Sequence, residues 1–72
     1  MKISKEMRRV LRFLGRRQWA TPKDCRCNYR TFVALEQRGL IRVATTIASI
    51  VSPHDFAEAY LTEAGKLELK RR

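Results

Sequence analysis

The chain has 72 residues, of which 44% are hydrophobic, and it carries a formal net charge of +9 at pH 7. This length predicts a single domain over residues 1–72 with one small core, and the apolar fraction argues against a disordered chain. No apolar run reaches the roughly 18 residues of a transmembrane helix, and arginines interrupt residues 7–14, where a signal peptide would need an apolar stretch. We therefore expect a cytoplasmic protein with no membrane partner.

The positive charge is concentrated in the first 43 residues. Residues 1–20 have a net charge of +6 and residues 21–43 of +3, whereas residues 44–72 are neutral. No Lys or Arg lies between Val43 and Gly65. This asymmetry predicts a basic face that attracts a polyanion to the N-terminal part of the fold.

The first predicted helix begins after Ser4, a favourable N-cap, and ends at Gly15. Its apolar residues recur at i, i+3, i+4 and i+7, and they form one stripe of Met7, Val10, Leu11 and Leu14. We expect this stripe in the core of the domain. The same stripe is compatible with a second interpretation, a basic helix that lies on a membrane surface.

The second predicted helix is short and covers residues 22–26. Thr21 serves as its cap, Pro22 takes the first helical position and Asp24 the third, a combination typical of helix starts. The residues before it, 18–20, should form an extended connector.

A longer helix should run from its cap at Asn28 to Arg38, with Phe32 and Leu35 facing the core and Gly39 ending it. The short helix, the tight turn and this longer helix form a candidate helix-turn-helix motif. In such a motif the second helix enters the DNA major groove and its side chains reach the base edges.

A β-hairpin is predicted after these helices. Residues 40–51 are mostly β-branched and apolar, which is the composition of a strand. Residues 52–55, Ser-Pro-His-Asp, have the composition of a turn, and residues 56–61 return as the partner strand.

The last predicted helix covers residues 63–70 and is capped by Thr62. Leu67 and Leu69 are its expected apolar positions. Gly65 is unfavourable so early in a helix, and we interpret it as room for close packing. The fold class is therefore mainly α with a small β-hairpin.

This order of elements resembles a winged helix-turn-helix: a three-helix core, a hairpin wing and a short C-terminal helix. It is similar to small bacterial and phage transcription regulators of the MarR and PadR kinds. The resemblance rests on the residues that end the third helix and begin the last one, namely Leu35, Gly39, Leu40, Ile41, Leu61, Thr62 and Gly65. It implies sequence-specific binding to double-stranded DNA, regulation of transcription, and a small strand at residues 18–20 that pairs with the wing.

With Phe32 and Leu35 buried, the opposite side of the helix over residues 28–38 is predicted to read bases, through Asn28, Tyr29, Arg30, Val33 and Gln37. Arg30 suits guanine, the amides of Asn28 and Gln37 suit adenine, and Val33 suits a thymine methyl group. Tyr29 suits a phosphate or a stacked base. The residues expected to contact phosphates are Arg16, Arg17, Thr21, Lys23, Arg26 and Arg42.

The predicted wing departs from the family pattern, because its tip at residues 52–55 has no Arg or Lys to insert into a minor groove. Its apolar strands suggest self-association into a homodimer through the wing, and the terminal helices are the alternative contact. An alternative function is a protein–protein interaction module that binds a host or regulatory protein through this uncharged wing. Structured RNA is a third candidate partner.

Catalytic and metal sites are not expected. Cys25, Cys27 and His54 are three residues at spacings unlike those of zinc fingers, and zinc usually takes four ligands. The two cysteines are too close in sequence for an unstrained disulfide, so we expect free thiols. With one histidine and no paired acids, the sequence predicts neither an enzyme nor a cofactor.

Overall fold

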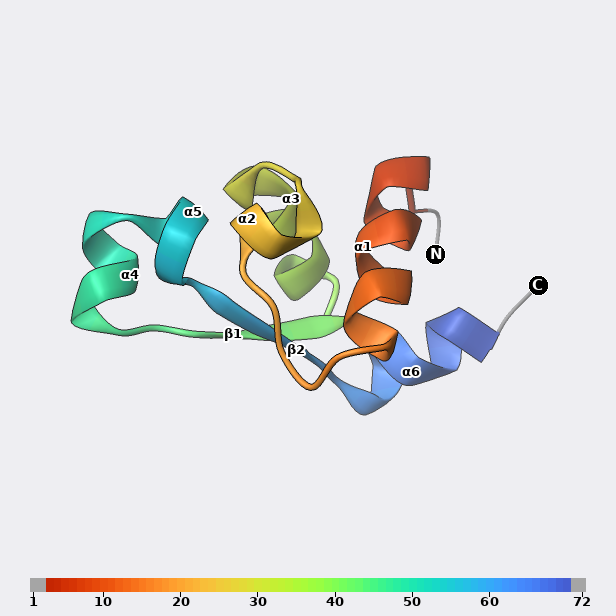
Figure 1. The fold of residues 1–72 in the computed structure, drawn as a ribbon. Helices are drawn as coiled ribbons and strands as arrows, with labels where there is room; N and C mark the ends of the chain where they lie inside the picture. Colours follow the sequence, from red (N-terminus) through yellow and green to blue (C-terminus); the bar gives the residue numbers. More distant parts are fainter. Residues whose placement is uncertain (1–2, 71–72) are drawn as a thin grey trace.

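The structure, a computed structural model, describes residues 3–70. Its elements follow in the order α1 (Lys5–Gly15), α2 (Pro22–Cys25), α3 (Tyr29–Gln37), β1 (Ile41–Ala44), α4 (Ile47–Val51), α5 (Pro53–Phe56), β2 (Glu58–Leu61) and α6 (Glu63–Lys70). Figure 1 shows an elongated molecule with α4 at one end, α1 and α6 at the other, and α2 and α3 between them. The mainly helical fold with one small antiparallel strand pair is therefore confirmed.

Helix α1 forms as the sequence predicts. The Ser4 hydroxyl oxygen accepts a hydrogen bond from the Met7 amide at 3.1 Å, which satisfies an N–H group that the helix leaves without a partner. Val10, Leu11 and Leu14 are buried on the inner side, and Met7 packs against them at the edge of the core. The predicted core stripe is confirmed.

The core lies where α1, α3 and the strand pair meet. Phe32 and Leu35 from α3 are fully buried, as predicted. The remaining buried hydrophobic residues of this cluster are Val10, Leu11, Leu14, Ala20, Cys25, Cys27, Leu40, Ile41 and Ala59. Burying such side chains is the main stabilising contribution that a domain of this size has available.

Strands β1 and β2 pair antiparallel, with Ile41 opposite Leu61 and Ala44 opposite Glu58. The connector before α2 forms an isolated antiparallel bridge with β2. The Ala20 amide donates to the Ala59 carbonyl at 3.2 Å, and the Ala59 amide donates to the Ala20 carbonyl at 2.9 Å. Ala20, the last residue of the connector predicted at residues 18–20, is thus paired with β2.

The long hairpin predicted over residues 40–61 is wrong in its distal half. Residues 47–51 form helix α4, and the expected turn at 52–55 begins helix α5. Thr46 and Ser49 form a capping box at the start of α4, and proline occupies the first position of α5. These local helix signals outweigh the β-propensity of the isoleucines, which have no partner strand to pack against at this end of the molecule.

Helix α6 begins after Thr62, whose hydroxyl accepts from the Gly65 amide at 3.1 Å. Gly65 is buried, and a β-carbon there would collide with the Leu40 carbonyl oxygen, so the predicted close packing is confirmed. The expectation for Leu67 is wrong, because this side chain is 62% exposed. The contact at Gly65 turns Glu68 inward, where its carboxylate lies 3.7 Å from the Arg8 guanidinium.

Candidate nucleic-acid interface

Local hydrogen bonds fix the start of α2, and the turn after it leads directly into α3. The Thr21 hydroxyl accepts from the Asp24 amide, and the Asp24 carboxylate accepts from the Thr21 amide, each at 3.2 Å. Arg26 then adopts a left-handed conformation with φ of 54°, which ends α2 and redirects the chain before α3 begins at Tyr29. Asn28 starts α3 by accepting from the Arg30 amide at 3.0 Å. The two helices therefore meet through a tight turn, as a helix-turn-helix requires.

Arg9 of α1 holds this turn in place. Its guanidinium donates to the Cys25 carbonyl at 2.7 Å and to the Arg26 carbonyl at 3.2 Å. It also donates to the Glu6 carboxylate at 2.8 Å, and this hydrogen bond raises the pKa of Arg9 and lowers that of Glu6. The sequence showed Arg9 only as one of several cations on the polar side of a helix. Its role was missed because periodicity does not show which distant carbonyl groups lie beside that side.

The predicted base-reading residues share one helix but differ in exposure. Arg30, Gln37 and Asn28 are exposed, although the Asn28 side-chain oxygen already accepts the capping hydrogen bond. Val33 is half-buried, and Tyr29 is half-buried because it packs against the core. The side chains most available to a DNA base are therefore those of Arg30 and Gln37.

Most of the predicted phosphate contacts are exposed cations. Arg16, Arg17, Lys23, Arg26 and Arg42 all reach solvent. The Arg17 guanidinium lies 5.3 Å from the centre of the Phe13 ring, a cation–π contact that orients it. Thr21 differs from them, since it is buried and its hydroxyl already accepts the capping hydrogen bond from Asp24.

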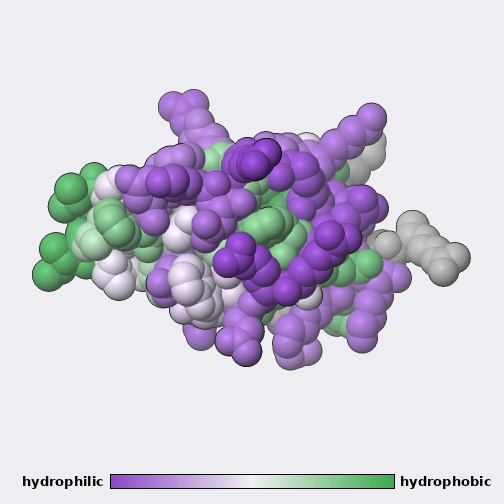
Figure 2. Space-filling model, in the orientation of Figure 1, coloured by the Kyte–Doolittle hydropathy of each residue, from purple (hydrophilic) through white to green (hydrophobic). Residues whose placement is uncertain are grey.

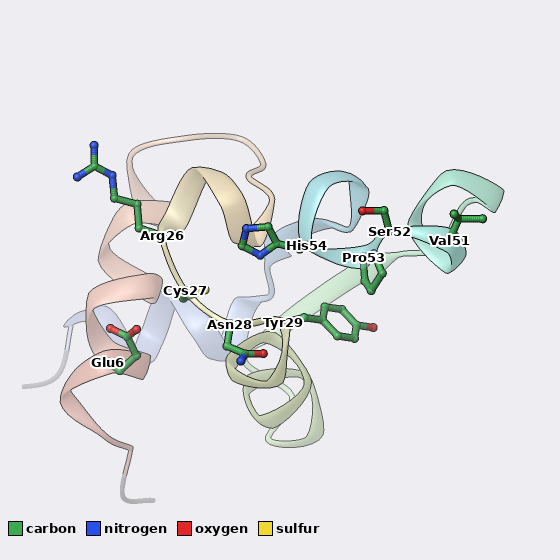
Figure 3. Close-up of a pocket in the computed structure, with 9 residues that line it drawn as sticks. All are labelled: Glu6, Arg26, Cys27, Asn28, Tyr29, Val51, Ser52, Pro53 and His54. Atoms are coloured by element: carbon green, nitrogen blue, oxygen red, sulfur yellow. The ribbon is translucent and has the colours of Figure 1, made fainter.

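A hollow of about 730 Å³ lies beside the start of α3. The turn before α3 forms one wall, the α4–α5 corner forms the other, and α1 contributes one acidic residue. The lining residues are Glu6, Arg26, Cys27, Asn28, Tyr29, Val51, Ser52, Pro53 and His54. In Figure 3, Arg26 extends away from the other lining residues, whereas His54 and Asn28 lie on facing walls. The imidazole of His54 and the amide of Asn28 are hydrogen-bonding groups that suit a phosphate or a base edge.

Both cysteines are buried free thiols. A hydrogen bond from the Cys25 thiol to Cys27, together with burial, raises the pKa of Cys25, and the same hydrogen bond lowers the pKa of Cys27. Cys27 and His54 line the same hollow, but within residues 3–70 no group of three or more His, Cys, Asp or Glu residues is placed to hold a metal ion.

Along the same described part of the chain, every helix is too short or too polar to cross a bilayer. Comparisons with protein-family models, with curated proteins and with solved structures find no match for this chain. The winged-helix resemblance stays a prediction, and the function has to be inferred from the residues and their geometry.

Proposed function

We propose that this chain is a winged-helix type of protein that binds double-stranded DNA in the cytoplasm of a bacterium, either as a bacterial or as a phage regulator of transcription. The observation that carries the proposal is a capped α3 that follows a tight turn and exposes polar residues within the basic part of the chain. In this proposal α3 enters the major groove, and α1 and β1 lie along the phosphate backbone.

Base recognition would come mainly from two exposed residues of α3. The Arg30 guanidinium has the fork geometry that pairs with the two acceptors of guanine, and the Gln37 amide pairs with adenine. Asn28 and Tyr29 lie at the start of the helix beside the hollow, where they suit a phosphate or the backbone of a base step. Val33 offers an apolar contact to a thymine methyl group.

Phosphate binding would come from five exposed cations, which lie after α1, in or after α2, and on β1. Arg16 and Arg17 follow α1, Lys23 and Arg26 lie in and after α2, and Arg42 lies on β1. Arg9 is not among them, because its guanidinium already donates three hydrogen bonds within the fold. Five phosphate contacts release counterions and make the affinity strongly dependent on salt.

A titration of random-sequence duplex DNA at several salt concentrations tests the proposal. We expect binding at about 50 mM salt and a slope of log affinity against log salt near −4 or −5, since each phosphate contact contributes roughly −0.9. A double variant, Arg17→Ala with Lys23→Ala, removes two of the proposed phosphate contacts and should flatten the salt slope by about two units. Absence of binding to any duplex at low salt would overturn the DNA proposal.

The second candidate function is a protein-binding module, and it is favoured by the exposed apolar residues of α4 and α5. Contacts made by such residues bury apolar surface and depend only weakly on salt. A partner that binds equally well at low and high salt, combined with no affinity for DNA, would favour this second function.

A further inference from the structure

The α4 end of the molecule presents an apolar surface, which we call the apolar tip. It consists of Ile47, Ile50, Val51 and Phe56, which are 84%, 71%, 80% and 51% exposed. Figure 2, in the orientation of Figure 1, shows a hydrophobic surface at the α4 end of the molecule. Large apolar residues grouped in this way mark an interaction site more often than single exposed ones do.

Hydrogen bonds between polar groups stabilise the helix of the apolar tip, and its apolar side chains are not needed for them. The Ser49 hydroxyl accepts from the Thr46 amide at 2.7 Å and donates to the Thr46 carbonyl at 2.8 Å, and the Thr46 hydroxyl accepts from the Ser49 amide at 3.1 Å. Ser49 is buried, whereas the apolar residues at positions i, i+3 and i+4 of the same helix face outward. The fold therefore presents a preformed apolar stripe that contributes little to its own core.

The charge distribution makes the apolar tip the surface through which two copies of this chain repel each other least. Two copies repel each other because each carries a net charge of +9. The apolar tip lies in the stretch between Val43 and Gly65, which contains no Lys or Arg. Contact through the tip therefore keeps most cations of the two copies apart, and the nearest ones are those of α2, which packs against α5. In a two-fold contact, the apolar stripe of one copy also packs against the same stripe of the other copy.

We propose that the apolar tip is a two-fold contact between two copies of the chain. The molecule measures 37 × 21 × 20 Å, and α3 lies near the middle of the long axis with α4 at one end (Figure 1). Tip-to-tip contact thus separates the two α3 helices by roughly one molecular length. That separation is close to the helical repeat of DNA, about 34–36 Å. This second step rests on the proposed DNA binding, whereas the dimer itself does not.

Sedimentation equilibrium without DNA tests the dimer directly. Four side chains make a contact at the small end of protein interfaces, so we expect a monomer–dimer equilibrium at about 10–100 μM. Ile50→Lys should weaken the dimer at least about tenfold, because it places unpaired charges in a desolvated contact. Leu67→Lys is the matched control, since Leu67 is an exposed apolar residue on α6, 62% against 71% for Ile50, and it should leave the dimer unchanged. Circular dichroism verifies that both variants fold.

Three results would overturn the tip contact: a strictly monomeric wild type, an Ile50→Lys variant that dimerises equally well, or equal loss in Leu67→Lys. A monomeric wild type would indicate that the apolar tip binds a different protein.

In a separate measurement, duplexes with two binding sites about 10 and about 15 base pairs apart should differ in cooperativity, with the shorter spacing favoured. Equal cooperativity would overturn the spacing of the two α3 helices. Absence of any DNA binding would overturn the proposed function and leave the dimer measurement intact.

Discussion

Apolar side chains are buried at one end of this molecule and exposed at the other. Around α1 and α3, residues such as Leu35 and Phe32 are fully buried and the surface above them is basic. At the apolar tip, Ile47 is 84% exposed and cations are absent from the surrounding sequence. The first region is stabilised by its core and the second by hydrogen bonds of a short helix. This difference indicates that one region carries the fold and the charge, while the other is available for contact.

The strongest test of the comparison is the same truncation at both ends. Leu35→Ala should destabilise the domain by about 2–5 kcal/mol, because it leaves a cavity in the core. Ile47→Ala should change the unfolding free energy by less than about 0.5 kcal/mol, because its side chain is already in water. Urea denaturation followed by circular dichroism measures both. Similar losses for the two variants would contradict the division into a core region and a contact region.

A second test separates two kinds of cation within the basic region. Arg30→Ala should cost about 1–3 kcal/mol on a selected binding site and relax its sequence preference, because Arg30 is placed to read a base. Lys23→Ala should weaken all sequences alike and flatten the salt slope by about one unit. Competition binding on a selected and a scrambled duplex distinguishes them. If Arg30→Ala discriminates the two duplexes as well as the wild type does, α3 does not read the bases through this side.

The sequence predicts the core region better than the tip, for a physical reason. In α1 and α3 the apolar residues recur with the period of a helix, and that period reports the buried side directly. In residues 45–51 the composition favours a strand, but β-propensity describes packing against a partner strand, and within residues 3–70 no strand pairs with this segment. The sequence features that indicate helices here are local. Thr46 and Ser49 stand three residues apart and form a capping box, and Pro53 takes the first position of α5. Leu67 is exposed, contrary to the prediction, because the tertiary contact of Gly65 sets the inner side of α6.

The candidate site was likewise predictable only in part. Exposure of Arg30 and Gln37 follows from the burial of Phe32 and Leu35 on the other side of the same helix. The hydrogen bonds of Arg9 to the turn before α3 span 16 and 17 residues, and no local pattern shows such contacts. The hollow beside Asn28 also depends on the position of α5, which the sequence assigned to a turn.

The smallest expected effect compares two capping boxes of the same design. Thr21→Ala and Thr46→Ala each remove a hydroxyl that accepts one amide hydrogen bond, at 3.2 and 3.1 Å, and such a loss typically costs about 1 kcal/mol. Thr21 is buried beside the core, so its loss should lower the stability of the whole domain. Thr46 is exposed at the tip, so its loss should open α4 locally and leave global unfolding nearly unchanged. Hydrogen exchange of residues 47–51, measured together with the melting temperature, distinguishes the two cases. If Thr46→Ala lowers the melting temperature as much as Thr21→Ala does, the tip unfolds with the core, and the contrast between the two ends is lost.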